Sequence, residues 1–575
     1  MKLEYLANEV LHDLFEYFDP IELIHAFEGL NTRFNRLLFI YFRSYRLDFR
    51  SISKSNFDLI CKQYLPLIID HVSSLCLSDG GETPQLYEHL TAYCLTIDEF
   101  THLRSLLLQK IDSTNIILNI TSDCFYLPYL THLKIVECNF PNEKDPKQLI
   151  YNIWHLNNLT HCTLDMTFEW RLSFCGLSII SKSIEYLSIK DYIFSSLELT
   201  HLLTLTPYLR HLCITFGESI DIISQRILIA PYLTSLELHF GGSQSTLTNI
   251  LKSMPNLLHL KLETGSIHLN GNQWKQILIN YVPKIKIFRF LIRVLSLKDN
   301  HVEEYLEDLL STFQTPFWMD DHQWYVRCDW PQHTNKIFVL YTLPYCFGDT
   351  YVVYQNRWSK TTCPNVRDCN CYDRVKDVFY KGRIDNFVLF AICYPKIRRL
   401  TLKLPFDVNF WTIIPRLDNL TSLEVIQTQE NIRSESQLKE LLNRAPRLDF
   451  LSVDAISFLL LAQLNITHVS LRRIQLKPYR SRTNRYLNAA QCSILARSLL
   501  GLQCEVLVIR IENRQIILDL IHTMYNLRAL TFECQDDNSL VHSNDELVEW
   551  LRNSLPETYS VTRHRSRLVG IWINR

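Results

Sequence analysis

The sequence predicts an α/β solenoid, and two recurring features of the chain predict it. The first is a phrase in which an apolar residue is followed, three and five positions later, by two more apolar residues, as in Leu130, Leu133 and Ile135. The second is a proline two residues before the first apolar position, as in Pro128. Proline ends a helix and favours an extended conformation in the residue before it. We therefore expect strand-and-helix units that stack around one continuous core.

The phrase recurs at a nearly constant interval. Between positions 103 and 285 its copies start 24 to 29 residues apart, which matches the period of leucine-rich repeats. We expect a leucine-rich-repeat horseshoe with parallel strands on the concave face and helices on the convex face; the alternative is an unrelated α/β protein with leucine-rich strands. The copies start at Val72, Leu103, Leu130, Leu159, Ile184, Leu209, Leu233, Leu257, Ile285, Ile397, Leu420, Leu448, Ile466, Cys504 and Leu527. The phased prolines are Pro128, Pro207, Pro231, Pro255, Pro283, Pro395 and Pro446.

The composition excludes several classes of protein. The 575 residues are 47% hydrophobic and 21% charged, which is the balance of a folded chain too long for one compact core. A formal net charge of −1 gives no overall electrostatic reason to bind nucleic acid or an anionic membrane. No apolar run reaches the ~18 residues that cross a bilayer, and no secretory signal opens the sequence. The 17 cysteines form no even-spaced framework, so we expect reduced thiols and a cytoplasmic or nuclear location.

The repeat phrase is interrupted in the middle of the chain. The interruption contains several tryptophans and the strand-like run from Lys336 to Thr342. Aromatic and β-branched residues favour strands, so we expect a β-rich insertion or distorted repeats here. The expected domains are an N-terminal helical module at 1–48, repeats at 60–295, the interruption at 296–392, and further repeats with a C-terminal cap at 393–575.

A zinc site is one alternative in the interruption. Cys363, Cys369 and Cys371, with Cys346 or His333 nearby, are residue types that bind zinc. They form no paired Cys-x-x-Cys knuckles, and we expect loop thiols without a metal.

An acid–base cluster is a second alternative. Asp320, Asp321 and His322 are adjacent, but adjacent residues on a strand point to opposite faces, so they need not converge. The chain also contains no phosphate-binding loop, nucleophile elbow or His-Glu-x-x-His helix. We therefore expect a non-catalytic protein without a cofactor, with an enzyme built on residues 296–392 as the less favoured reading.

Three short helices are expected before the first repeat. Each begins after a residue that can cap a helix and carries large apolar side chains at helical spacing. Proline at the first helical position and glycine after the last turn mark the second helix. The expected helices span 9–18, 21–28 and 32–40, with Asn8, Asp19 and Asn31 as caps, Pro20 at the second start and Gly29 at its end.

These residues resemble the F-box family. The run from Leu6 to Leu23 and the run from Leu30 to Phe34 follow the F-box pattern, with Ala7 and Glu22 in place of the usual proline and aspartate. This resemblance, in front of leucine-rich repeats, implies a Skp-type adaptor that links the chain to a cullin–RING ligase. The alternative is a set of helices that only caps the solenoid. By matching positions, the implied adaptor contacts are Leu6, Glu9, Val10, Leu14, Phe15, Phe18 and Leu23.

The target of such a receptor is expected on the concave face. Side chains alternate across a strand, so the residues between the buried apolar ones face this surface. Both signs of charge are mixed with rings, which suits a protein target better than a polyanion. A metal or pH-sensing role for the histidines is the less favoured alternative, because Tyr186 and Ser235 interrupt their row. The expected target-binding residues are His132, Lys134, Tyr186, Lys190, His211, Glu237, His239, His259, Lys261 and Glu263.

These observations together predict the substrate-recognition subunit of a Skp–cullin–F-box type ubiquitin ligase. It would act as a monomer within a hetero-complex, with a protein target and without nucleic acid, membrane or cofactor. The alternative is a leucine-rich-repeat scaffold that has no connection to a ligase.

Overall fold

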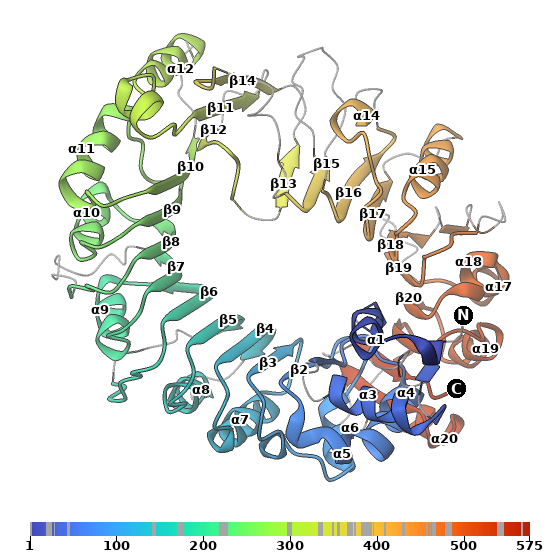
Figure 1. Cartoon of the computed structure of the whole chain (residues 1–575). Helices are drawn as coiled ribbons and strands as arrows, with labels where there is room; N and C mark the ends of the chain where they lie inside the picture. Colours follow the sequence, from blue (N-terminus) through green and yellow to red (C-terminus); the bar gives the residue numbers. More distant parts are fainter. Residues whose placement is uncertain are drawn as a thin grey trace.

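Each copy of the repeated phrase forms one strand, and the strands stack side by side into two curved sheets that together make a ring (Figure 1). The computed structural model describes residues 3–15, 17–18, 23, 26–27, 29–42, 46–140, 145–168, 174, 176–217, 228–295, 302–331, 337–347, 350–353, 357–364, 372, 375–380, 394, 396–406, 410–427, 432–455, 458–459, 462, 467–477, 486–537, 545–564 and 567–575.

The first sheet has 13 strands in the order β1 to β10, then β12, β11 and β14. Strands β1 to β10 pair in parallel and follow the order of the chain. The last three strands pair antiparallel. The strands are β1 (Arg46–Asp48), β2 (Ser74–Ser78), β3 (Ser105–Gln109), β4 (His132–Phe140), β5 (His161–Phe168), β6 (Tyr186–Phe194), β7 (His211–Gly217), β8 (Ser235–Gly241), β9 (His259–Thr264), β10 (Ile287–Leu295), β12 (Ile337–Thr342), β11 (Val326–Pro331) and β14 (Arg357–Thr361).

The second sheet has 10 strands and continues the ring. Its strands are parallel as far as β21, after which β23 and β22 pair antiparallel and close its edge. In spatial order they are β13 (Thr350–Val353), β15 (Asp377–Tyr380), β16 (Arg399–Leu404), β17 (Ser422–Gln427), β18 (Phe450–Asp454), β19 (Arg473–Lys477), β20 (Val506–Ile511), β21 (Ala529–Cys534), β23 (Leu568–Trp572) and β22 (Ser560–His564).

The helices lie on the outside of the ring (Figure 1). Helix α10 shows why: Ser243 caps its first turn, and Leu247, Ile250 and Leu251 are buried against the strands. The predicted α/β solenoid is therefore confirmed, and no helix among the residues described is long and apolar enough to cross a membrane. The outer helices are α4 (Lys54–Leu59), α5 (Leu65–Ile68), α6 (Leu86–Ala92), α7 (Thr114–Asp123), α8 (Asp145–Trp154), α9 (Ser196–Leu205), α10 (Gln244–Lys252), α11 (Gly271–Tyr281), α12 (Val302–Ser311), α14 (Phe410–Ile413), α15 (Ile432–Arg444), α17 (Ala489–Arg497), α18 (Leu499–Gln503), α19 (Gln515–Thr523) and α20 (Glu546–Ser554).

The register of the repeats follows the predicted phrase with one exception. In every copy but one, the strand begins two residues after the first apolar residue. The copy expected at Ile466 is wrong: β19 begins at Arg473, and Val469, which the prediction placed in the core, is 88% exposed. The buried phrase is Leu471, Ile474 and Leu476. Two overlapping copies of the same pattern stand here, and the later one fills the core; Ile466 itself lies outside the residues described.

The middle of the chain combines two kinds of structure. Strands β11, β12 and β14 are antiparallel, whereas β13 and β15 begin the parallel second sheet. Trp318 and Trp324 are buried and pack on Phe288 of β10, which joins this segment to the core of the first sheet.

The cysteine prediction is corrected in one place. Cys363 is disulfide-bonded, so the expectation of reduced thiols throughout is wrong there. The other cysteines that the structure describes are free. Cys369, Cys371 and His333 of the suggested zinc site lie outside the residues described.

The buried side chains of the N-terminal module form one continuous hydrophobic core with those of the first repeats. Helices α1 (Asn8–Phe15) and α3 (Thr32–Phe42) pack together, and the ring of Phe27 lies 5.0 Å from that of Phe15 and 5.5 Å from that of Phe34. Arg33 of α3 donates hydrogen bonds to the carbonyl oxygens of residues 4 and 6 and to the Asn8 side chain. Most of the helix expected at 21–28, with its start at Asp19 and Pro20, lies outside the residues described.

The two ends of the solenoid meet, so the open horseshoe of the prediction is a closed ring (Figure 1). The ring of Trp572, in β23, lies 5.4 Å from that of Phe57 and 5.7 Å from that of His89. The Asn574 side chain donates a hydrogen bond of 3.3 Å to the Asp58 carboxylate. We call this contact between the first and last repeats the seam.

Candidate functional site

Four aromatic side chains form a stack on the concave face. The ring centroids lie 4.2 Å apart between His132 and His161, 5.5 Å apart between His161 and Tyr186, and 4.3 Å apart between Tyr186 and His211. The planes of neighbouring rings differ by 5° to 17°, so the rings are nearly parallel. We call this row across β4, β5, β6 and β7 the ring ladder.

The pairing register of the strands produces the ring ladder. His132 is paired with His161, His161 with Tyr186, and Tyr186 with His211, on strands that are ~4.8 Å apart. Two threonines orient the first two imidazoles, because the hydroxyls of Thr131 and Thr160 each form a 2.9 Å hydrogen bond with Nδ1 of the following histidine. The repeated phrase thus brings residues from four separate repeats into one surface.

Two of the ladder imidazoles are held neutral. Burial is the main cause that lowers the pKa of His132 below its ordinary value, and His161 and Lys134 lower it further. Burial also lowers the pKa of His211, although the Glu237 carboxylate opposes that shift. A neutral imidazole offers one hydrogen-bond donor and one acceptor. Around neutral pH, these two imidazoles and the Tyr186 ring contribute polar edges without charge.

The charged residues beside the ring ladder pair with one another across neighbouring strands. Such pairing neutralises the surface locally and gives it little attraction for a polyanion. The pairs are Lys261 with Glu237 at 2.9 Å, Lys190 with Asp165 at 3.2 Å, and Arg293 with Glu263.

The residues expected to bind a target are not all equivalent. His132, Tyr186 and His211 join the ring ladder, and the paired charges lie beside it. His259 is exposed and stands apart from the ladder, because Ser235 occupies the strand between them. Among the residues that the structure describes, no three or more histidine, cysteine or acidic side chains are arranged to hold a metal ion. Target contact at these residues stays a prediction.

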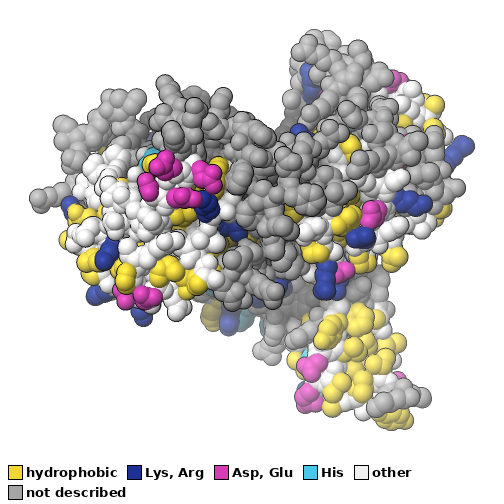
Figure 2. Space-filling model, turned by 90° about the horizontal axis from the view of Figure 1, so that it is seen from above, with side chains coloured by type: hydrophobic (Ala, Val, Ile, Leu, Met, Phe, Trp, Pro, Cys, Tyr) yellow, Lys and Arg dark blue, Asp and Glu magenta, His cyan; other side chains and the backbone are white. Residues whose placement is uncertain are grey.

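The N-terminal module presents apolar side chains to solvent. Figure 2 shows a projecting lobe, at the place of the N-terminal helices in Figure 1, on which apolar side chains gather. Val10, on the outer face of α1, is 47% exposed. An exposed apolar group of this kind usually marks a protein interface. The large apolar residues exposed on the module are Leu3, Tyr5, Val10, Tyr17, Leu30 and Ile40.

Burial divides the expected adaptor contacts into three groups. Phe15 and Leu23 are fully buried in the hydrophobic core, and adaptor contact at these two positions stays a prediction. Glu9 and Val10 are exposed, whereas Leu6, Leu14 and Phe18 are partly buried and partly accessible.

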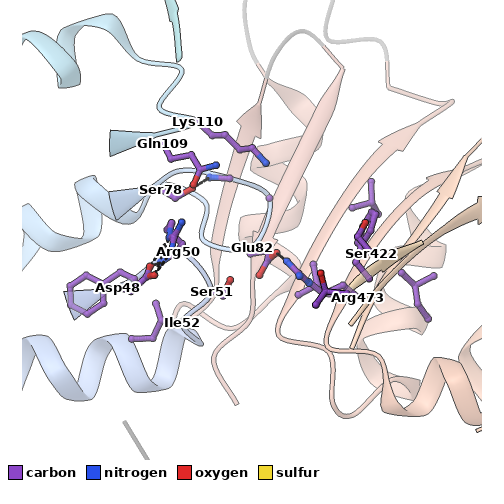
Figure 3. Close-up of a pocket in the computed structure, with 18 of the residues that line it drawn as sticks. Asp48, Arg50, Ser51, Ile52, Ser78, Glu82, Gln109, Lys110, Ser422 and Arg473 are labelled. Atoms are coloured by element: carbon purple, nitrogen blue, oxygen red, sulfur yellow. Dashed lines mark hydrogen bonds and ion pairs between the residues drawn. The ribbon is translucent and has the colours of Figure 1, made fainter. Parts of the chain in front are cut away.

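Sequence reasoning missed the polar centre of the seam. Glu82 accepts a hydrogen bond of 2.7 Å from Arg473 and one of 3.1 Å from Arg528 (Figure 3). Burial alone would raise the pKa of Glu82, but the two arginines and the hydroxyl of Ser51 outweigh it, and the pKa lies below its ordinary value. No periodic signal marks Glu82, since it stands in a glycine-rich turn after β2.

A cavity of about 750 Å³ lies beside this centre (Figure 3). Residues from both sheets line it, including Asp48 and Arg50 beside β1 and Ser422, Phe450 and Arg473 of β17, β18 and β19. Its arginines are paired: Arg50 with Asp48 at 2.5 Å and Arg473 with Glu82 at 2.7 Å. The cavity therefore separates the two ends without presenting an uncompensated charge from these residues.

No family model matches this chain. No curated protein matches it in sequence. Among solved structures, it is similar to the crystal structure of a Rad7 and Elc1 complex in yeast, with 13% identity over 87% of this chain and 86% of that one and a TM-score of 0.24. It is also similar to an internalin from Listeria monocytogenes, with 11% identity over 67% of this chain and 75% of that one and a TM-score of 0.21. Both TM-scores are below 0.5, so the fold description rests on the strand pairing given above.

Proposed function

We propose that this chain is the substrate-recognition subunit of a Skp–cullin–F-box type ubiquitin ligase. Residues 3–40 bind a Skp-type adaptor, which links the chain to a cullin–RING ligase. The concave face of the repeats binds the protein that is to be modified. The observation that carries the proposal is an F-box-like module whose outer face keeps apolar side chains in solvent.

The exposed face of α1 supports adaptor binding. Leu11 and Phe15 are buried, so they fix the inner face of this helix, and Glu9, Val10 and Asp13 lie on its outer face. Val10 would lose apolar surface to a partner, which favours association. The partly buried Leu14 lies beside it, at i+4 on the same helix. A partner helix laid along this face would cover both residues.

The seam argues against the scaffold alternative, in which residues 3–40 only cap the solenoid. Trp572 and Asn574 contact α4 of the first repeats, so the C-terminal repeats already cover this end of the stack. The outer face of the module, where Val10 is exposed, takes no part in that contact and is available to a partner.

The concave face suits a protein target. Tyr186 and three imidazoles supply ring surface together with polar edges, and aromatic residues are enriched at protein interfaces. The neighbouring charges are paired, which disfavours nucleic acid. We therefore place the target at the ring ladder and at the pairs Lys190–Asp165 and Lys261–Glu237.

Calorimetric titration of the purified chain with a Skp-type adaptor tests the proposal. We expect binding by the wild-type chain and at least roughly tenfold weaker binding by Val10→Glu, because a carboxylate would be desolvated in the contact. Phe15 is unsuitable for this test, since a charge in the core of the module would unfold it. Ile279→Glu, at an exposed position on α11, is the matched control and should bind normally.

Two results would oppose the proposal. A wild-type chain that is folded by circular dichroism and shows no binding would favour the scaffold alternative. Equal binding by the wild type and Val10→Glu would move the contact away from α1. The ladder residues are tested separately, by Tyr186→Ala, which should keep adaptor binding and lose the target.

A further inference from the structure

The ring consists of two arcs, one built on the first sheet and one on the second. The contacts between the arcs differ at the two points where they meet, and one of these points is the seam. Within each arc, neighbouring repeats share hydrogen-bonded strands. At the seam, the contacts described between the arcs are made by side chains and loops. Strand β1 pairs with β2 alone, so it is an edge strand there. At the other meeting point the chain crosses between the sheets three times, from β12 to β13, from β13 to β14 and from β14 to β15. Figure 1 shows this junction across the ring from the seam.

We propose that the ring is a clamp that opens at the seam, with Glu82 as its latch. The two arcs move as rigid bodies, and the open state exposes the concave side of β19, β20 and β21. This inference concerns the solenoid alone and does not depend on adaptor binding by the N-terminal module.

Glu82 has the geometry of a latch. Its two carboxylate oxygens divide between two partners, since Oε1 accepts from Arg473 and Oε2 accepts from Arg528. Arg528 also pairs with Glu505 at 3.2 Å, and Arg473 pairs with Asp449. The two arginines therefore keep a carboxylate partner on their own arc when Glu82 leaves. That arrangement lowers the cost of opening, because it leaves neither guanidinium without an anion.

The turn before Glu82 allows a very close approach. Thr531, on β21, donates a hydrogen bond of 3.3 Å to the carbonyl oxygen of Gly81. A Cβ atom at Gly81 would lie 2.7 Å from the Thr531 hydroxyl oxygen, so a side chain at position 81 fits the closed ring only when that hydroxyl moves or is removed. The close fit is limited to this point, because the cavity of about 750 Å³ lies directly beside it.

The apolar part of the seam is small. Trp572 is the residue of the C-terminal arc that joins the hydrophobic core of the first arc, where it meets Phe57, His89 and the Lys54 ammonium. The rest of the C-terminal arc has a separate core. An interface with one aromatic anchor and an ionic centre resembles a contact between domains that move, whereas a shared core would make the arcs inseparable.

The meeting point opposite the seam keeps specific contacts. Arg289 of β10 donates a hydrogen bond of 2.6 Å to the carbonyl oxygen of Leu343, and the hydroxyls of Tyr341 and Tyr372 lie 2.7 Å apart. These contacts tie the β12 end of the first sheet to the residues that lead into the second, and they hold the arcs together on this side when the seam opens.

A disulfide across the seam reports the closed state. A Cβ built at Gly81 lies 3.7 Å from the Thr531 Cβ, within the ~3.5–4.5 Å that a disulfide requires. We expect the double variant Gly81→Cys/Thr531→Cys to form this bond on mild oxidation, detected as a cross-linked peptide by mass spectrometry. Adding Glu82→Lys should slow its formation by roughly tenfold or more, because the latch is lost. Glu88→Lys, an exposed change on α6, is the control and should leave the rate unchanged.

Small-angle scattering supplies the second readout. The full chain with Glu82→Lys should show a larger radius of gyration than the wild type at unchanged helix content. Forming the 81–531 disulfide in that variant should restore the wild-type value, and reduction should reverse it. An equal cross-linking rate with and without Glu82→Lys would overturn the latch, and an unchanged radius of gyration would overturn the clamp. If Glu82→Lys does not fold, the milder Glu82→Gln takes its place; loss of helix content there too would show that the seam is inseparable from the fold.

Discussion

The indole ring of Trp572, three residues before the last residue of the sequence, packs against the phenyl ring of Phe57 in α4, with the ring centroids 5.4 Å apart. Both side chains are fully buried. The Lys54 ammonium lies over the same indole ring, 5.6 Å from its centroid. A buried aromatic side chain at the meeting point of two ends should contribute a large part of the free energy that keeps them together.

Trp572→Ala should therefore lower the free energy of unfolding by about 3–5 kcal/mol, the range for truncating a buried aromatic residue. Urea unfolding followed by circular dichroism measures this loss. Trp550→Ala, at a partly exposed position on α20, is the control and should cost less. A loss at Trp572 no greater than at Trp550 would show that the seam contributes little to stability.

His89 predicts how stability depends on pH. Burial, assisted by Lys54, lowers the pKa of His89 from 6.5 to about 4. Between these values the unfolded chain binds a proton that the folded chain does not, so the free energy of unfolding should fall as the pH drops from about 6.5 to about 4. The contribution is fully present above pH 6.5. Thermal unfolding of the wild type and of His89→Gln across this range measures it, and the variant should show the flatter profile.

Asp79 makes the free energy of unfolding depend on pH with the opposite sign. The effect of His89 can therefore be isolated only by comparing the wild type with His89→Gln. Burial raises the pKa of Asp79 from 3.8 to about 7, so its contribution to stability is lost as the pH rises through 7. The contribution of Asp79 to the free energy of unfolding is the same in the wild type and in His89→Gln, so it cancels when the two profiles are subtracted. Identical profiles for the two proteins would mean that His89 has the same pKa in the folded and the unfolded chain.

Gly271 should tolerate no side chain. A Cβ atom there would lie 2.3 Å from the carbonyl oxygen of Thr312, and the Gly271 N–H donates a 2.8 Å hydrogen bond to the hydroxyl of the same residue. Gly271→Ala should therefore destabilise the chain by about 1–3 kcal/mol, as overpacking does. Gly265→Ala is the matched control, because its Cβ would meet the nearest backbone oxygen at an ordinary 3.5 Å. Differential scanning calorimetry of both variants measures the difference. Equal melting temperatures would contradict the close approach of the Gly271 and Thr312 backbones.

The ring ladder predicts an energetic coupling between neighbours. The rings of Tyr186 and His211 are 4.3 Å apart, and a double-mutant cycle with alanine at both positions should give about 0.5–1.5 kcal/mol of coupling. The control cycle uses His211 and His259, which Ser235 separates, and should be additive within ~0.5 kcal/mol. Equal coupling in both cycles would mean that the ring stack adds nothing to the sheet.

The sequence predicted the strands well because each repeat satisfies the same local rule. A strand such as β4 needs apolar residues at fixed positions, and Leu130, Leu133 and Ile135 supply them whatever the rest of the chain does. The rule fails where two copies overlap, as at Ile466, and where a ring replaces an aliphatic residue: β15, with Val375, Val378 and Tyr380 buried, was not anticipated.

The seam could not be predicted for a different reason. Glu82 meets Arg473 and Arg528 because the curvature of the stacked repeats adds up to a full turn (Figure 1), and curvature is the sum of small rotations that no single repeat encodes. Burial within the N-terminal module was equally hidden. The F-box-like pattern identifies Phe15 and Val10 as members of one motif, whereas only packing shows that Phe15 faces inward and Val10 outward.

The closed ring changes how such a stack comes apart. In an open array the terminal units have one neighbour each, so they fray first and disorder spreads inward along the line. Here the contact of Trp572 with Phe57 gives each end a second neighbour, so the repeats form a closed circle of contacts rather than a line. Fraying then has no ordinary starting point. Unfolding must then begin at one of two places. A repeat inside an arc can unfold only by breaking its interfaces with both neighbours. The seam is the alternative, and its stability then limits the stability of the whole ring.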